Sequence, residues 1–251
     1  MKLLHWIEAF YISDVQNNSR DLSMDLTENE IKYTISNARH HHVIRWLRCR
    51  CHVDTKFHAE TVSSIYYDTW GWKSLYEKLN SDYLKTKIRL RWYSDVAYLR
   101  HDKLSFAEAK FRIGTKRNKI RIETPYSGEW IAKTALNNPV LLKIPSLLAT
   151  HGATRGENYF PVYQISYKRL RFRDPISDTT ICFDYDIAMP RLNPFMLPNG
   201  RPCALQTAVL ELKGAVNQIP VFVRPVVELG FKKESFSKYG ACFQKMAERA
   251  R

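Results

Sequence analysis

The clearest pattern in this sequence is the alternation of charged and apolar residues in six separate segments. Successive side chains of a β-strand point to opposite faces, so charges at every second position share one face. The apolar residues between them, such as Ile88, Leu90 and Leu212, then share the other face. The segments are Glu28-x-Glu30-x-Lys32, Lys85-x-Lys87-x-Arg89-x-Arg91, Glu108-x-Lys110-x-Arg112, Lys119-x-Arg121-x-Glu123, Arg169-x-Arg171-x-Arg173 and Glu211-x-Lys213. Each segment predicts a strand with one charged face and one apolar face.

A single alternating strand usually has one face on the core and the other in water. These segments differ from ordinary solvated strands because arginine and lysine dominate them. The guanidinium group presents a planar fork of donors that matches phosphate oxygens. We therefore expect the strands to close into one antiparallel barrel with the charges inside. Such a barrel would be a tunnel for a polyanion, with a few glutamates available to hold a metal.

The rest of the pattern predicts an α+β fold, an eight-stranded antiparallel β-barrel with peripheral helices and a C-terminal helix. Strands are expected near residues 26–35, 62–67, 162–173, 179–187 and 208–213, with three more between 82 and 124. Helices are expected over 36–51, 72–79 and 235–249, with two short ones between 129 and 150. Ser235 or Ser237 would cap the last helix. Lys238 would then lie in its first turn, where free backbone donors and the helix dipole favour a phosphate.

The N-terminal segment is set apart by its composition. Residues 1–12 have an amphipathic pattern that Glu8 interrupts, and a polar stretch follows up to residue 25. We expect a short helix and a linker over 1–25 and a single domain over 26–251. No segment resembles a secretory signal or has the length of apolar sequence needed to cross a bilayer. Any membrane-protein partner would therefore be a separate chain.

The composition narrows the choice of partner and compartment. Lys and Arg number 39 against 25 Asp and Glu, a formal net charge of +14, so we expect an anionic partner. Nucleic acid is the less favoured candidate because the cations alternate within strands and do not cluster on one helix or tail. The five cysteines contain no CxxC pair, which argues against a disulfide framework and a zinc site. A reducing, cytoplasmic location fits this cysteine usage.

Six motifs in order along the chain carry a family resemblance. They are Glu28-x-Glu30-x-Lys32, Ser64-Ile-Tyr-Tyr-Asp-Thr69, Arg89-Leu-Arg-Trp-Tyr93, Glu108-x-Lys110, Glu211-Leu-Lys213 and Phe236-Ser-Lys-Tyr239. Together they resemble the VTC domain, the polyphosphate polymerase branch of the triphosphate tunnel metalloenzyme, or CYTH-like, superfamily. The resemblance implies eight antiparallel strands around a tunnel. It also implies transfer of the γ-phosphate of ATP to inorganic polyphosphate with Mn²⁺ or Mg²⁺.

The resemblance also assigns roles to individual residues. Glu211 matches the family's metal-holding acid, and Glu30 is a second metal candidate. Ser237 and Lys238 match a phosphate-binding pair near the terminal helix. The matches to the catalytic basic residues that grip the triphosphate and the product chain are Lys32, Arg89, Arg91, Lys110, Lys119 and Arg169.

Two further basic residues, Arg121 and Lys213, lie on the same predicted faces as matched residues. They are candidates for phosphate binding. They could equally form internal salt bridges with Glu108 or Glu123, and the sequence leaves both alternatives open.

One departure from the family pattern bears on function. The family usually has Arg-x-Thr-x-Asp where this chain has Thr180-x-Cys182-x-Asp184, so Thr180 replaces an expected phosphate-binding arginine. A charge-assisted contact contributes about 1.5–3 kcal/mol, and Arg171 or Arg173 could compensate for its loss. Polyphosphate polymerase remains the leading hypothesis. The alternatives are a tunnel triphosphatase, which gives the phosphate to water, and a module that binds polyphosphate without catalysis.

Overall fold

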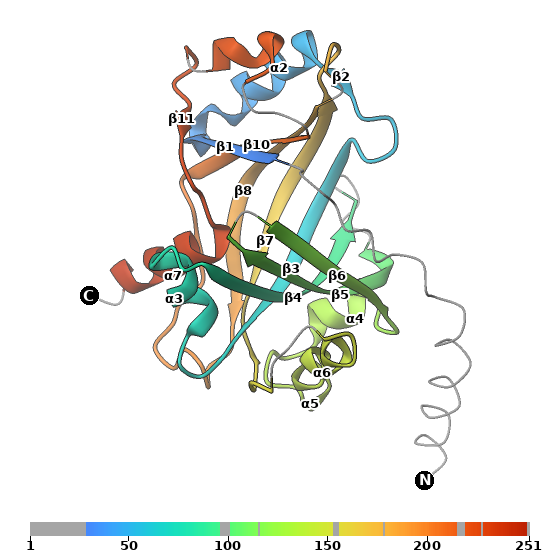
Figure 1. The fold of residues 1–251 in the computed structure, drawn as a ribbon, viewed down its shortest axis with the longest axis vertical. Coiled ribbons are helices and arrows are strands. Elements are labelled where there is room, and N and C mark those ends of the chain that lie inside the picture. Colours follow the sequence, from blue (N-terminus) through green and yellow to red (C-terminus); the bar gives the residue numbers. More distant parts are fainter. Residues whose placement is uncertain are drawn as a thin grey trace.

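One antiparallel sheet forms the body of the protein (Figure 1). The computed structural model describes residues 29–95, 101–114, 116–152, 156–177, 179–214, 219–226 and 228–249. The predicted N-terminal helix and linker lie outside these residues, so the domain division at residue 25 stays a prediction. Within the described ranges, no helix has the length and apolar character needed to cross a membrane.

The strands follow the order β11-β1-β10-β8-β7-β3-β4-β5-β6, and two short strands attach to the side of this path, β2 to β7 and β9 to β8. The long strands are β1 (Asn29–Ser36), β3 (Ala59–Asp68), β4 (Leu84–Ser94), β5 (His101–Ile113), β6 (Lys116–Thr124), β7 (Phe160–Arg173), β8 (Thr180–Leu192) and β10 (Thr207–Gly214). The two-residue strands are β2 (His52–Val53), β9 (Cys203–Ala204) and β11 (Lys232–Lys233). The predicted strands are thus present, and β8 runs to Leu192, past the end predicted near residue 187.

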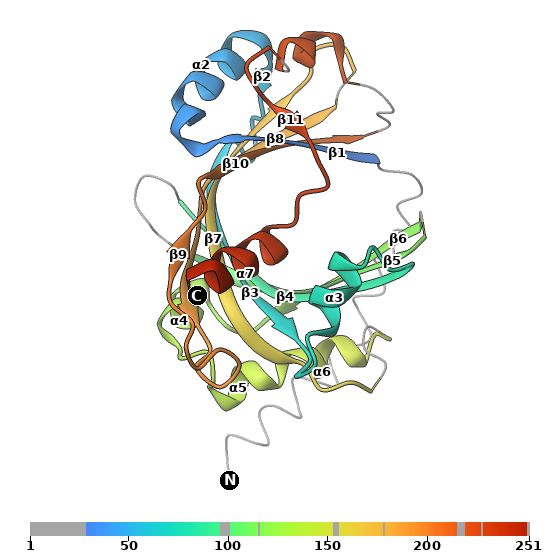
Figure 2. The same cartoon turned by 90° about the vertical axis from the view of Figure 1, so that its left-hand side faces the viewer.

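The prediction of a closed eight-stranded barrel is wrong. Within the residues that the structure describes, the sheet has eleven strands, eight of them with eight or more residues, and it is open, because its path ends at β11 and β6. Closure would need hydrogen bonds between the two edge strands. Instead, β11 pairs with the outer edge of β1 through Lys232 and Lys233. The sheet curls strongly without closing, so it has a concave and a convex face (Figure 2).

The helices surround this sheet. They are α2 (His40–Arg50), preceded by the 3₁₀ turn η1 (Asn37–Arg39), α3 (Lys73–Leu79), α4 (Gly128–Lys133), α5 (Pro139–Leu142), α6 (Ile144–Ala149) and α7 (Lys238–Arg249), with a second 3₁₀ segment η2 (Val221–Val226). Three short helices replace the two predicted between 129 and 150. Asn138 caps α5, with Pro139 in its first turn, and Pro145 lies in the first turn of α6, where proline is tolerated.

The apolar halves of the alternating segments lie on the convex face. Ile88 and Leu90 pack in one buried cluster with Leu141 of α5 and Leu148 of α6. Leu212 packs in another, with residues of α2 and η2. Burying a large aliphatic side chain contributes about 1.5–3 kcal/mol, so these helices fix which way each strand faces. The charged residues therefore face the concave side, which confirms the predicted orientation.

One end of the concave face is covered by α7, which lies inside the curve of the sheet (Figure 2). Tyr239 anchors this helix, because its hydroxyl donates to Asp68 at 2.7 Å and its carbonyl accepts from Tyr163 at 2.6 Å. Asp68 also accepts hydrogen bonds from the backbone of Ser74 and Leu75 at the start of α3. Both helices are thereby held at one end of the concave face.

Candidate functional site

The first group of charges on the concave face surrounds Glu108 on β5. Its Oε2 accepts a 2.6 Å hydrogen bond from Nε of Arg89 and lies 3.8 Å from Arg91. Its Oε1 lies 3.6 Å from Lys119 and 3.5 Å from Arg121 on β6. We call these five residues the Glu108 cluster. They meet because Glu108 lies opposite both Arg89 and Arg121 in the strand register.

The second group surrounds Glu211 on β10 and is called the Glu211 cluster. Its carboxylate lies 3.1 Å from Lys238, 3.3 Å from Arg169, 3.4 Å from Lys213 and 3.6 Å from Lys32. The five residues come from four elements, β1, β7, β10 and α7. One buried carboxylate thus gathers four cations.

Two more carboxylates border the Glu211 cluster. Asp184 on β8 is fully buried and accepts two hydrogen bonds from Arg169, at 2.6 and 2.7 Å. It also lies 2.6 Å from Lys238. Glu30 lies 3.6 Å from Lys32 and 4.0 Å from Lys213. Each carboxylate therefore shares cations with Glu211.

Charge pairing decides the protonation of these groups. Burial alone would raise the pKa of Glu211, but Lys238, Lys32, Lys213 and Arg169 hold it well below its usual value. In the same way, Arg89, Arg91, Lys119 and Arg121 overcome burial and hold the pKa of Glu108 well below its ordinary range. Both carboxylates are ionised at neutral pH.

The start of α7 brings two predicted phosphate-binding residues to this face. Lys238 is the first residue of the helix, and the backbone N–H of Gly240 donates to Oγ of Ser237 at 3.4 Å. Ser237, one of the two predicted capping residues, therefore caps the helix. The same hydroxyl lies 3.3 Å from Nζ of Lys87 on β4.

Opposite sides of the curled sheet influence each other electrostatically. Burial and the charges of Arg89 and Lys213 lower the pKa of Lys110 well below its usual value, although Glu30 opposes them. Lys110 lies on β5 and Lys213 on β10, and four strands separate these two in the sheet. The curl, and not direct pairing, therefore brings the two groups near each other.

The structure thus brings all the predicted site residues to the concave face or to the start of α7. The two residues with open alternatives both form ion pairs: Arg121 pairs with Glu108, as one alternative predicted, and Lys213 pairs with Glu211 and Glu30, which are not the predicted partners. Phosphate binding by either residue stays a prediction. Sequence reasoning left Lys87 without a role, although it shares the alternation of Arg89 and Arg91. It named Glu108 only as a salt-bridge partner, yet Glu108 is the centre of a cluster.

Thr180 lies on the same face, at the start of β8. Its register partners are Lys213 on β10 and Arg173 on β7. Of the two arginines that could replace the missing one, Arg171 donates to Glu60 at 2.9 Å. Arg173 lies at the strand end, half-exposed and 3.5 Å from Asp54. Thr180 therefore lies among basic side chains, although the arginine of the family pattern is absent at this position.

The carboxylates of this face are the groups that could hold a divalent cation. Among the described residues, no three His, Cys, Asp or Glu side chains lie close enough to form a metal site by themselves. Glu211 and Glu30 lie near each other, since Lys32 and Lys213 each contact both carboxylates, and the charge of Glu211 opposes the ionisation of Glu30. Magnesium is commonly held by one or two carboxylates together with substrate phosphates. The two glutamates fit that mode of binding, which needs the phosphate oxygens as further ligands.

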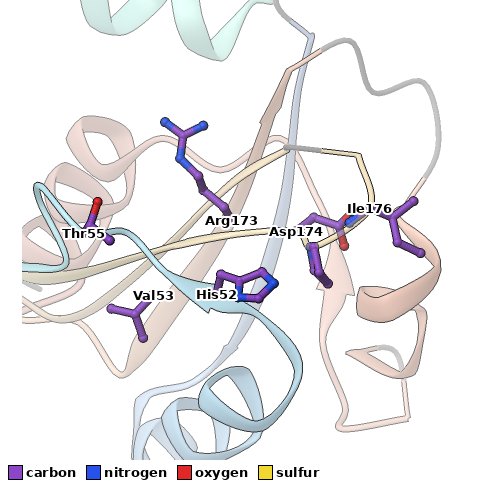
Figure 3. Close-up of a pocket in the computed structure, with 7 residues that line it drawn as sticks. His52, Val53, Thr55, Arg173, Asp174 and Ile176 are labelled. Carbon is purple, nitrogen blue, oxygen red and sulfur yellow. Dashed lines mark hydrogen bonds between the residues drawn. The ribbon is translucent and has the colours of Figure 1, made fainter.

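A separate hollow of about 490 Å³ lies where β2 meets the end of β7 (Figure 3). No residue of the Glu108 or Glu211 cluster lines it, but Arg173, one of the two arginines that could compensate for Thr180, does. Its lining residues are His52, Val53, Thr55, Arg173, Asp174, Pro175 and Ile176.

Fold and site together define an antiparallel β protein whose curled sheet presents a cationic inner face. The family model described as the VTC domain matches residues 27–247, and the chain belongs to this family. No curated protein matches the chain.

Two solved structures are similar at low identity. A candidate adenylate cyclase from Vibrio parahaemolyticus is 13% identical with a TM-score of 0.44, over 86% of this chain and 97% of that one. A second, from Bacillus halodurans, is 11% identical with a TM-score of 0.42, over 90% and 91% of the two chains.

Proposed function

We propose that this chain is a polyphosphate polymerase, which transfers the γ-phosphate of ATP to the end of an inorganic polyphosphate chain. The observation that carries the proposal is the excess of cations on the concave face. Among the described residues, four carboxylates, Glu30, Glu108, Asp184 and Glu211, contact the cations of the two clusters. The predicted basic residues of this face are Lys32, Arg89, Arg91, Lys110, Lys119, Arg121, Arg169, Lys213 and Lys238. Such a surface is suited to a ligand with several adjacent negative charges.

The chemistry requires alignment and charge neutralisation more than covalent help from the protein. A terminal oxygen of the polyphosphate chain attacks the γ-phosphorus of ATP. The bond between that phosphorus and the β–γ bridging oxygen breaks, and ADP leaves with the electron pair. The attacking oxygen is already ionised, so the step needs no general base.

Each cluster has a role in this proposal. Arg89 and Arg91 present guanidinium groups from neighbouring positions of one strand face, and Arg169 presents a third from β7. These groups would hold the equatorial oxygens of the transferring phosphate. Lys32 and Lys213 would neutralise the remaining charge of the triphosphate. Glu108 and Asp184 orient the arginines through the hydrogen bonds described above.

A divalent cation, Mn²⁺ or Mg²⁺, belongs to this proposal. Glu211 and Glu30 would hold it together with phosphate oxygens, and its charge would stabilise the transferring group. Lys32 and Lys213 contact both glutamates in the ligand-free chain, and phosphate oxygens offer the two ammonium groups new partners.

One observation favours a second function, polyphosphate binding without catalysis. Thr180 stands on the concave face where the family pattern has an arginine. Without that contact, the phosphate could be bound but misaligned, since small misplacements cost large factors in rate.

The test is ³¹P NMR of the purified protein with ATP and Mn²⁺. A growing signal from internal polyphosphate phosphorus supports the polymerase. Orthophosphate alone would mean that water is the acceptor and that the protein is a triphosphatase. Unchanged ATP, together with tight binding of polyphosphate, would refute the polymerase and support a module that binds polyphosphate without catalysis.

A further inference from the structure

Several lysines at the α3 end of the concave face have no acidic partner in the part of the chain that the structure describes. Among the described residues, no carboxylate oxygen lies within 4.0 Å of Lys78, Lys87 or Lys110, whereas Lys32 and Lys238 each contact at least one. Lys87 on β4 is also directly opposite Lys110 on β5 in the strand register. Like charges opposite each other destabilise a sheet. The arrangement therefore costs stability in the ligand-free protein.

These lysines meet the segment that leads into α7. Nζ of Lys87 lies 3.3 Å from Oγ of Ser237, and Nζ of Lys78 on α3 donates to the carbonyl and hydroxyl of Ser235 at 3.1 and 2.8 Å. Free backbone donors and the positive end of the helix dipole lie at the start of α7. Two ammonium groups, a hydroxyl and a helix N-terminus thus converge from β4, α3 and α7.

The environment of Lys87 is unusually positive. Burial, followed by the charges of Lys32, Lys78 and Arg89, lowers its pKa to about 7, and Glu30 opposes this only in part. The charged groups that face Lys87 come from β1, α3, β4 and β5, and they are Lys32, Glu30, Lys78, Arg89 and Lys110. A phosphate bound here would add negative charge and restore the protonated form. Proton binding and anion binding at this position would therefore favour each other.

This group adjoins the Glu211 cluster, because Ser237 is followed in the chain by Lys238, which contacts Glu211. A polyanion on the central cations could thus extend along the face toward α3. A triphosphate has few phosphates to reach beyond the clusters, whereas a polyphosphate chain has many.

We propose that Lys87 and Lys78, with Ser237, form a phosphate subsite for a chain longer than a triphosphate. A phosphate in this subsite would add negative charge beside Lys87, and Lys87 would then take up a proton. The inference rests on the proposed binding of polyphosphate at the same face, and it names the part of that face that distinguishes a long chain from a short one. The subsite makes the affinity for long chains depend on pH.

The test compares tripolyphosphate with long-chain polyphosphate by isothermal titration calorimetry of the full chain, in buffers of different ionisation enthalpy. The variants are Lys87→Met and Lys87→Arg, with Lys143→Met as the control. Lys143 is exposed between α5 and α6, on the convex side, so its variant removes the same charge away from the site.

The wild-type protein should take up protons when it binds the long chain, and its affinity should fall by up to about tenfold per pH unit above pH 7. Lys87→Met should abolish this proton uptake. It should also weaken long-chain binding by about ten- to a hundredfold, and weaken tripolyphosphate binding far less. Lys87→Arg should keep the affinity but lose the pH dependence, because arginine stays charged. Lys143→Met should match the wild type.

Proton uptake that persists in Lys87→Met and Lys87→Arg would overturn the subsite, as would equal losses of affinity for the two ligands. If Lys87→Met does not fold, Lys87→Arg and Ser237→Ala carry the test, and Ser237→Ala should weaken the long chain selectively. Wild-type protein that binds neither polyanion would refute the proposed function and this inference with it. Wild-type protein that binds both, with Lys87→Met identical to it, would refute the subsite alone.

Discussion

Replacing Glu211 by glutamine tests the charge balance of the concave face directly. The substitution keeps the shape of the side chain but removes the negative charge at the centre of the Glu211 cluster. Four cations that lie between 3.1 and 3.6 Å from this carboxylate would then face each other without it. We expect the ligand-free protein to be markedly destabilised.

The size of the effect follows from the burial and the remaining partners. Removing one member of a buried ion pair costs about 3–5 kcal/mol, and Glu211 is only 4% exposed, so solvent screening is small. Asp184 still contacts Arg169 and Lys238, which leaves two of the cations compensated. We therefore expect a loss near the lower end, about 3 kcal/mol. For a domain of this size the melting temperature should fall by about 6–12 °C.

The assay is thermal unfolding with and without tripolyphosphate, at matched ionic strength in sulfate. A polyanion neutralises the same cations that Glu211 neutralises, so tripolyphosphate should raise the melting temperature of Glu211→Gln more than that of the wild type. The control is Glu248→Gln, which removes an exposed partner of Lys245 and should change stability by less than about 0.5 kcal/mol.

The reasoning would be refuted by a Glu211→Gln variant as stable as the wild type, because its cations would then not be held together by this carboxylate. Equal stabilisation by sulfate and tripolyphosphate would count against a specific polyanion site, since it would indicate general screening.

Three further predictions follow from individual residues. The folded-state pKa of Lys87, about 7, is below the ordinary value of 10.5, so the unfolded chain binds more protons between these pH values. The free energy of unfolding should therefore rise from about pH 7 to about pH 9, and it should rise less steeply in Lys87→Met. Urea unfolding at several pH values measures this dependence, and equal slopes for the two proteins would contradict it. Thr180→Arg should strengthen polyphosphate binding about tenfold, as calorimetry can measure. It should also lower the stability of the protein without ligand, as thermal unfolding can measure, because the register partners of Thr180 are Lys213 and Arg173. An unchanged affinity would mean that Thr180 does not lie on the path of the phosphate chain. Gly128→Ala should lower the free energy of unfolding by about 1–3 kcal/mol, since the added Cβ would lie 2.6 Å from Cδ1 of the buried Trp92. An unchanged midpoint of unfolding would mean that α4 can shift to make room for the added carbon.

The orientation of the charged residues could be predicted from the sequence because it follows from the strand backbone alone. Once Ile88 and Leu90 face the helices, Arg89 and Arg91 must face the other side. The same argument applies to Leu212 and Glu211. The residue types before α7 also narrowed its cap to Ser235 or Ser237, of which Ser237 is the cap.

The open edge of the sheet could not be predicted in this way, because closure depends on contacts between distant segments. Nothing local to Lys232 and Lys233 indicates that they pair with β1. The ion-pair partners also depend on the curl and the strand register. Arg121 meets Glu108 because the turn between β5 and β6 places them opposite each other, and one residue of slip would have exchanged the faces.

The Glu211 cluster joins the first strand to the last helix of the described chain. Lys32 on β1 donates to the carbonyl of Phe236, 204 positions away, and Lys238 closes the cluster from α7. Contacts of such long sequence separation form late and slow the folding of a domain. A partly folded chain therefore lacks the phosphate-binding face even if its central strands have paired. A polyanion would then bind only the completely folded chain. The time at which binding appears during refolding would therefore report the final step of folding.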